Sequence, residues 1–113
     1  MKKTISLKLN RDFRRLYSRG KYAACGYVVV YVQKNRFSQN RLGLTCGKAV
    51  GKVVTRNRVK RLIRESYRLC EDSIKSGYDI VIVARARAAD KPFGTIYKDV
   101  RYAFNKLEMT EKK

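Results

Sequence analysis

The chain contains no histidine, and only 9 of its 113 residues are acidic. Without histidine it has no Ser-His or Cys-His nucleophile pair, and it lacks a common ligand of zinc sites. The nine acidic residues are scattered along the chain, so no tight cluster in the sequence is placed to hold metal ions. The sequence therefore argues against hydrolysis by protein side chains and predicts no metal site.

Cysteine and long apolar runs are also scarce. The three cysteines, Cys25, Cys46 and Cys70, lie far apart and fit neither a disulfide framework nor a C-x-x-C motif. We expect reduced thiols in a cytoplasmic protein. No run of about 18 apolar residues predicts a transmembrane helix. Residues 4–10 alternate apolar and polar side chains where a secretory signal would have an apolar core, so no such signal is expected.

Positive charge, in contrast, is in large excess. The 28 Lys and Arg residues give a net charge of +19. On a compact domain such a charge causes self-repulsion, which a polyanion offsets. Nucleic acid is the first partner that this predicts, an anionic membrane surface is the second, and a solvated basic surface without a partner is the third. The length and a hydrophobic content of 44% suit a single folded domain over residues 1–113.

Hydrophobic periodicity predicts the order helix, two strands, helix, strand, helix. Asn10 is a candidate cap for the first helix, and Gly20 suits a left-handed stop after it. The expected elements are an extended lead over 1–9, helix 11–19, strands 25–32 and 41–46 paired antiparallel, helix 54–74, a buried strand 78–85, helix 95–108 and a fraying tail 109–113. This order predicts an α+β fold, an α/β sandwich of one sheet with flanking helices.

The first strand has two different faces. Alternate positions place Val28, Val30 and Val32 on one face and Tyr27, Val29 and Tyr31 on the other. The valine face is the predicted core face, and the tyrosine face can meet solvent or a ligand. If the first helix lies beside it, Phe13 and Tyr17 join the tyrosines along one groove, which would suit single-stranded RNA held by stacking. The alternative is that Phe13 and Tyr17 are ordinary core residues.

The central helix separates an apolar arc from a basic one. The apolar arc holds Val59, Leu62, Ile63, Ser66 and Cys70, and the basic arc holds Arg56, Asn57, Lys60, Arg61, Arg64 and Arg68. Basic arcs are often merely solvated, but arginine forks suit phosphate contacts and few acids lie near enough to neutralise them. We interpret this arc, with the preceding Lys48 loop, as a phosphate-binding surface. Arg58 lies off the arc and either contacts RNA or serves the fold.

These segments resemble the bacterial ribonuclease P protein subunit along residues 5–108. The resemblance rests on Asn10-Arg11-Asp12-Phe13 with Tyr17 and Gly20, on Arg41-Leu42-Gly43-Leu44 with Lys48, on residues 51–65 around Arg56-Asn57-Arg58, and on residues 79–85. Gly47 and Ala49 depart from the family pattern, in which many members have serine and lysine there. The resemblance implies a fold like domain 2 of ribosomal protein S5, with one mixed central sheet and a left-handed β-α-β crossover that contains the basic helix.

The resemblance also implies a function. Members of the family join a catalytic RNA, and the holoenzyme removes the 5′ leader of precursor tRNA, with hydrolysis carried out by the RNA subunit and its magnesium ions and with no organic cofactor. Carried over by position, the leader contacts are Phe13, Tyr17, Tyr27, Val29 and Tyr31, and the RNA-subunit contacts are Lys48, Arg56, Asn57, Arg58, Lys60, Arg61, Arg64 and Arg68. The protein is expected to be monomeric apart from the RNA and not bound to a membrane.

Two other classes of function stay open on the sequence alone. A non-enzymic module that binds tRNA or ribosomal RNA would use the same basic helix without activating a partner RNA. A membrane-surface protein would expose an apolar stripe on a cationic helix. The predicted strands compete for that stripe as core, which disfavours the membrane reading.

Overall fold

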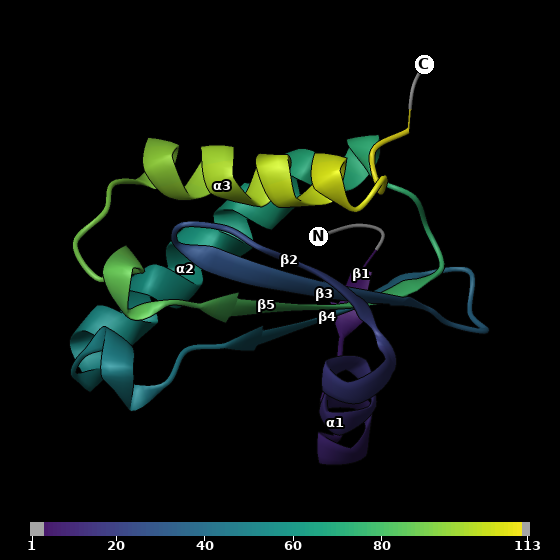
Figure 1. Cartoon of the computed structure of the whole chain (residues 1–113), viewed down its shortest axis with the longest axis horizontal. Helices are drawn as coiled ribbons and strands as arrows, with labels where there is room; N and C mark the ends of the chain where they lie inside the picture. Colours follow the sequence, from purple (N-terminus) through teal and green to yellow (C-terminus); the bar gives the residue numbers. More distant parts are fainter. Residues whose placement is uncertain (1–3, 112–113) are drawn as a thin grey trace.

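Five strands form one mixed sheet in the order β1-β4-β5-β3-β2 (Figure 1). The computed structural model describes residues 4–111. The strands are β1 Thr4–Ser6, β2 Lys21–Ala24, β3 Val28–Lys34, β4 Asn40–Thr45 and β5 Tyr78–Ala84. The helices are α1 Asn10–Arg19, α2 Val53–Cys70 and α3 Phe93–Lys106, with short 3-10 turns η1 Lys48–Val50, η2 Glu71–Ser73 and η3 Ala86–Ala88. The predicted α+β class is confirmed.

The central position in the sheet belongs to β5, which pairs antiparallel with β3 and parallel with β4. The prediction that strand 41–46 pairs antiparallel with strand 25–32 is therefore wrong. Ile80, Val81 and Ile82 are fully buried, so β5 has apolar side chains on both faces and takes the middle of the sheet. β4 instead lies between β5 and β1, parallel to both.

The connection from β4 to β5 is the left-handed β-α-β crossover that the resemblance implies. β4 and β5 are parallel neighbours in the sheet. The chain that connects them contains α2, which lies over the same face of the sheet as α3 (Figure 1). Parallel neighbours are almost always joined by right-handed crossovers, so this unit is a distinctive part of the fold. It sets the basic helix on the half of the sheet that contains β4 and β1.

The two short outer strands are absent from the predicted elements. β1 has three residues, and β2 has the sequence Lys-Tyr-Ala-Ala, with only Ala23 buried. Neither provides the apolar alternation that identifies a strand in a sequence. The bend over residues 25–27 turns β2 back onto β3, and the Cys25 amide donates to the Val28 carbonyl at 2.9 Å.

Each face of the sheet has its own core. Val28, Val30 and Val32 pack against α2 and α3, as predicted for the valine face. The opposite face is covered by α1 alone (Figure 1), over a smaller core of Leu7, Leu16 and Val81. This asymmetry leaves part of that face open beside α1.

Three helix-end and terminal predictions are wrong. Asn10 is the first residue of α1, and Leu9 is the cap, without a side-chain hydrogen bond. Gly20 is extended at φ −73°, and it is needed because a Cβ there would lie 2.7 Å from the Leu16 carbonyl oxygen. Met109 is buried, and the Glu111 amide donates to the Ser73 carbonyl at 2.8 Å, so the described tail through residue 111 does not fray. Residues 112–113 and 1–3 lie outside the described residues.

Candidate nucleic-acid interface

The sheet face beside α1 carries a continuous row of aromatic rings. The ring centroids of Phe13 and Tyr17 are 6.4 Å apart, those of Tyr17 and Tyr31 are 5.0 Å apart, and those of Tyr31 and Tyr22 are 5.6 Å apart. Phe13 and Tyr17 come from α1, Tyr31 from β3, and Tyr22 from the opposing position of β2. The Tyr17 and Tyr22 side chains are exposed, so the row offers ring surface to a ligand.

A hollow of about 540 Å³ opens at one end of this row. Phe13 and Tyr17 form one wall, and Thr45 and Cys46 at the end of β4 form the other. The Tyr17 and Thr45 hydroxyls are hydrogen-bonded at 3.1 Å across it. The hollow and the ring row together form an aromatic cleft, which is the term used below.

Tyr27 does not join the aromatic cleft, so the prediction of one groove containing all four rings is wrong for this residue. It lies in the bend before β3, and its ring packs against the larger core with Arg87 at 5.5 Å and Lys91 at 5.6 Å. Its amide donates to the Asp99 carboxylate at 2.8 Å. Val29 is half-buried and alternates with the buried Val28 and Val30, so it faces the same side as Tyr31.

The basic arc of α2 meets the aromatic cleft at its edge. Lys60 and Arg64 line a small side hollow of about 200 Å³, and Phe13 forms part of its wall. Asn57, Arg61, Arg64 and Arg68 are exposed, whereas Arg56 and Lys60 are half-buried. Val59, Ile63, Ser66 and Cys70 are buried, which confirms the predicted apolar arc, and Leu62 is half-buried. Tyr67, buried under Thr4 and Asn40, was not predicted on that arc. One cationic and one aromatic surface are thus continuous.

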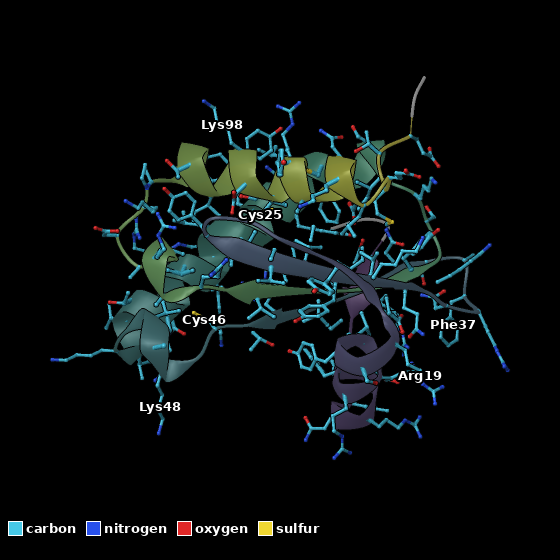
Figure 2. The ribbon with its side chains drawn as sticks, viewed as in Figure 1. Arg19, Cys25, Phe37, Cys46, Lys48 and Lys98 are labelled. Atoms are coloured by element: carbon cyan, nitrogen blue, oxygen red, sulfur yellow. The ribbon has the colours of Figure 1, made fainter. Side chains whose placement is uncertain are left out.

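Arg56 and Lys48 lie close to Cys46 at the same end of the molecule. Figure 2 shows Lys48 projecting outward from the turn that follows Cys46. The Arg56 Nε atom is buried and has no hydrogen-bond partner in the described chain. Burial raises the pKa of the Cys46 thiol, and the charges of Lys60 and Arg56 offset this only in part. The thiol is therefore protonated at neutral pH and does not compete for the neighbouring cations.

Two arginines of α2 are engaged within the protein. Arg58 donates to the backbone carbonyls of Ala89 at 3.2 Å and Lys91 at 2.9 Å. It therefore ties α2 to the loop before α3, which favours the structural alternative for this residue. Arg68 forms a two-pronged ion pair with Glu65, whose pKa the arginine hydrogen bond holds below its usual range. The last arginine of the basic arc is therefore already paired with a carboxylate of the same helix.

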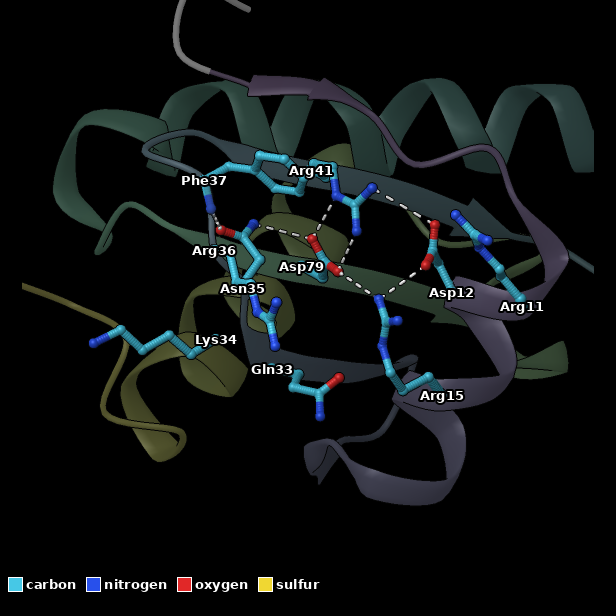
Figure 3. Close-up of a pocket in the computed structure, with 10 residues that line it drawn as sticks. All are labelled: Arg11, Asp12, Arg15, Gln33, Lys34, Asn35, Arg36, Phe37, Arg41 and Asp79. Atoms are coloured by element: carbon cyan, nitrogen blue, oxygen red, sulfur yellow. Dashed lines mark hydrogen bonds and ion pairs between the residues drawn. The ribbon is translucent and has the colours of Figure 1, made fainter.

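Sequence reasoning missed the ionic network that seats α1 on the sheet. Arg41 of β4 donates to both Asp79 carboxylate oxygens, at 2.7 and 2.6 Å (Figure 3). Asp12 of α1 accepts from Arg15 at 2.8 Å and lies 3.6 Å from Arg41. The acids were visible in the sequence, but their placement depends on the register of β4 against β5. Tyr22 is likewise not predicted, because it joins the ring row only through the register of β2 against β3, which sets it opposite Tyr31.

The described residues contain no disulfide, no group of metal ligands and no membrane-spanning helix. Within residues 4–111 all three cysteines are free and buried, and no group of metal-ligating side chains gathers that could hold an ion. No helix in that stretch is long and apolar enough to cross a membrane. The interface is therefore described by its rings and cations.

Comparison with known sequences identifies a family that matches nearly the whole chain. The model of the Ribonuclease P family matches residues 1–108. The ribonuclease P protein component of Clostridium botulinum (strain Loch Maree / Type A3) is 48% identical over 106 residues, which cover 93% of this chain and 92% of that protein. The ribonuclease P protein component of Clostridioides difficile (strain 630) is 42% identical over 109 residues, which cover 96% of both proteins.

Solved structures agree with these sequence matches. The Staphylococcus aureus RNase P protein superposes with a TM-score of 0.85 at 31% identity, over 94% of this chain and 97% of that one. The RNase P protein of Thermotoga maritima gives a TM-score of 0.78 at 32% identity, over 86% of this chain and 92% of that one. The similarity therefore extends over most of the sheet and helices.

Proposed function

This chain belongs to the ribonuclease P protein family, and we propose that its aromatic cleft and its basic helix serve two different RNAs of one ribonucleoprotein. As a ribonuclease P protein component it works in the endoribonuclease that matures the 5′ end of tRNA. The partners in the proposal are the catalytic RNA subunit and precursor tRNA. The proposed compartment is the bacterial cytoplasm, where tRNA precursors are made.

The aromatic cleft is the proposed site for the single-stranded 5′ leader. The observation that carries this proposal is the row of rings from Phe13 through Tyr17 and Tyr31 to Tyr22, with Lys60 and Arg64 at its edge. Rings beside cations hold successive bases by stacking and the backbone by charge. Mature tRNA has no leader, so contacts in the cleft favour the precursor over the product.

The exposed basic arc of α2 is the proposed contact with the RNA subunit. Four of its members, Asn57, Arg61, Arg64 and Arg68, are exposed on a helix whose opposite face is buried, and Lys48 extends the surface beyond the start of the helix. The full set is Lys48, Arg56, Asn57, Lys60, Arg61, Arg64 and Arg68, with Arg58 assigned to the fold. Lys60 and Arg64 also border the aromatic cleft, so in this proposal the leader lies next to the RNA subunit.

The mechanism we propose is assistance by charge and position. The RNA subunit with its magnesium ions carries out the hydrolysis, and the protein neutralises part of the repulsion between two polyanions. A net charge of +19 on 113 residues supplies this neutralisation. Each phosphate that the protein contacts reduces the number of cations otherwise needed to bring the two RNAs together.

Cleavage of precursor tRNA at low magnesium tests this function. The reactions contain the protein alone, the RNA subunit of the Clostridium botulinum enzyme alone, and both together. We expect cleavage at the mature 5′ end only when both are present. RNA binding by the protein without activation of cleavage would instead support a non-enzymic RNA-binding module.

A further inference from the structure

The opposite flank of α1 borders a second hollow, which the proposed function does not use. It measures about 460 Å³ and lies where β3 ends and β4 and β5 begin, under the β3–β4 loop (Figure 3). The aromatic cleft lies at the other end of β4, beside Thr45. The helix α1 therefore divides this face of the sheet into two separate binding surfaces.

The second hollow has an excess of three positive charges. Its two carboxylates are Asp12 and Asp79, which are 3% and 2% exposed. Its five cations are Arg11, Arg15, Lys34, Arg36 and Arg41. The two carboxylates are already held by Arg15 and Arg41. An anion entering the hollow thus meets cations without direct competition from a free acid.

The three remaining cations have donors to spare. Arg11, Lys34 and Arg36 are exposed, and no acceptor within residues 4–111 holds their charged groups. They come from three places, the first turn of α1, the end of β3 and the loop that follows. All three line the hollow, and Figure 3 shows Arg11 and Lys34 toward opposite sides of it with Arg36 between them, so they are spread to meet successive phosphates along a strand.

An aromatic ring stands beside these cations. Phe37 is 58% exposed, and the Arg41 guanidinium lies over its ring at 5.0 Å. The loop backbone that carries the ring is held by two hydrogen bonds. The Phe37 backbone amide donates to the Asn35 side-chain oxygen at 2.8 Å, and the Asn35 backbone amide donates to the Gly77 carbonyl at 2.8 Å. A preorganised ring beside cations loses little conformational freedom on binding.

We propose that this hollow binds an unpaired RNA nucleotide, with its base stacked on Phe37 and the adjoining phosphates of the strand held by Arg11, Lys34 and Arg36. Cations alone would accept any anion, but the exposed ring beside them selects a nucleotide. The inference rests on the proposed function and deepens it, because it adds a second RNA subsite to the aromatic cleft.

Further cations lie near the nucleotide site, after the end of α1. Arg19, Lys21 and Lys34 line a further hollow that shares Gln33 and Lys34 with the nucleotide site, and Glu108 and Met109 form its wall on the α3 side. Figure 2 shows Arg19 and Phe37 at the same end of the molecule. An unpaired nucleotide could be supplied by the distal part of a long leader or by the RNA subunit, and the experiment distinguishes these two sources.

Two matched pairs of variants test the site. Arg36→Glu is compared with Lys98→Glu, an equal change of charge on the outer side of α3 (Figure 2). Phe37→Ala is compared with Tyr102→Ala, since both rings are 58% exposed. Binding is measured for the Clostridium botulinum RNA subunit alone, and in the assembled holoenzyme for precursor tRNAs with leaders of about 4 and about 12 nucleotides.

We expect Arg36→Glu and Phe37→Ala to weaken one of these affinities about tenfold, with little effect of the α3 variants. Loss confined to the long leader identifies the leader as the source, and loss of RNA-subunit affinity identifies the RNA subunit. Equal effects of each variant and its α3 control on every RNA would overturn the inference. That result would leave the proposed function intact, because the cleavage assay with the unmodified protein tests that function separately.

Discussion

The ring of Tyr17 on α1 meets the ring of Tyr31 on β3 edge-on, with centroids 5.0 Å apart and planes at 74°. The Tyr17 hydroxyl also reaches Thr45 at the end of β4. One side chain thus joins a helix and two strands across the aromatic cleft. The geometry of the cleft consequently depends on where α1 lies, and a base that stacks there meets rings from two different elements.

Replacing Tyr31 with alanine removes the ring that connects Tyr17 to Tyr22. We expect the holoenzyme to lose about 1–3 kcal/mol of precursor tRNA affinity, since one stacking platform is worth this much. Affinity for mature tRNA should stay the same, because it has no leader. The measurement is equilibrium binding of both tRNAs, with Tyr102→Ala as the control. An equal loss for both tRNAs would count against a leader site.

Gly43→Ala tests the cleft without removing a ring. A Cβ at position 43 would lie 2.5 Å from Cζ of Phe13, so the ring must move out of its place. Because the displaced atom is at the end of a side chain, we expect the protein to fold and its leader affinity to fall. Circular dichroism and thermal unfolding check the fold, and binding of precursor tRNA checks the affinity. Unchanged binding would show that the position of Phe13 is unimportant.

Arg61→Ala tests the basic arc at an exposed arginine. We expect the holoenzyme to require more magnesium for assembly, because one phosphate contact is lost. The slope of log affinity against log salt for the RNA subunit should fall in magnitude by about 0.7–0.9. Lys98→Ala on α3 is the control with the same loss of charge. A magnesium requirement equal to that of the control would argue against an RNA contact at this position.

Arg58→Ala separates a structural arginine from its RNA-binding neighbours. Two hydrogen bonds from the Arg58 guanidinium to the carbonyls of Ala89 and Lys91 would be lost. We expect the free energy of unfolding to fall by about 2 kcal/mol, with the salt dependence of RNA binding unchanged. Urea unfolding and RNA titration measure the two quantities. Full stability together with a reduced salt slope would return Arg58 to the RNA contacts.

The Arg41–Asp79 pair should make stability depend on pH in the acid range. Burial raises the pKa of Asp79, but hydrogen bonds from Arg41 and Asn35 and the charges of Arg41 and Arg15 outweigh it and hold the pKa below its ordinary value. The pair therefore contributes its full stability above the unfolded-state pKa of about 4, and the contribution is lost as pH falls through the lower folded-state value.

Asp79→Asn measures this contribution. We expect a loss of about 3 kcal/mol at neutral pH, because Arg41 would lose its two short hydrogen bonds to a buried carboxylate and keep only the longer contact with Asp12. The gap between the two proteins in urea unfolding should narrow as the pH falls below about 4. A gap that stays constant into strong acid would mean that the ionised carboxylate is not the source of the stability.

Elements with strong local patterns could be predicted from the sequence. The valine face of β3 and the buried run of β5 are correct because each has one dominant apolar pattern. The two arcs of α2 are correct because they repeat at the helical period, but the helix ends at Cys70 and not at the predicted residue 74. The family resemblance added the left-handed crossover, which no local pattern contains. The five-stranded order was not predictable, since it depends on a three-residue strand and on the competition for the centre of the sheet.

The candidate site followed the same rule. Phe13, Tyr17 and Tyr31 come together as expected, because helix and strand periodicity fix which way each ring points. Tyr27 does not, since its backbone leaves the strand and is held by Asp99. Tyr22 and the Arg41–Asp79 pair depend on contacts between strands distant in sequence. Such contacts become visible only when the register of the sheet is known.

The small core beneath α1 has a consequence for how the molecule opens. Within residues 4–111 only three buried apolar residues form this core, and the ion pairs around Asp12 add the remaining hold on the helix. Local opening of α1 should therefore cost less free energy than opening of α2 or α3, and its amide hydrogens should exchange first. An RNA strand that contacts the helix from either flank would slow that exchange, so protection of the α1 amides records occupancy directly.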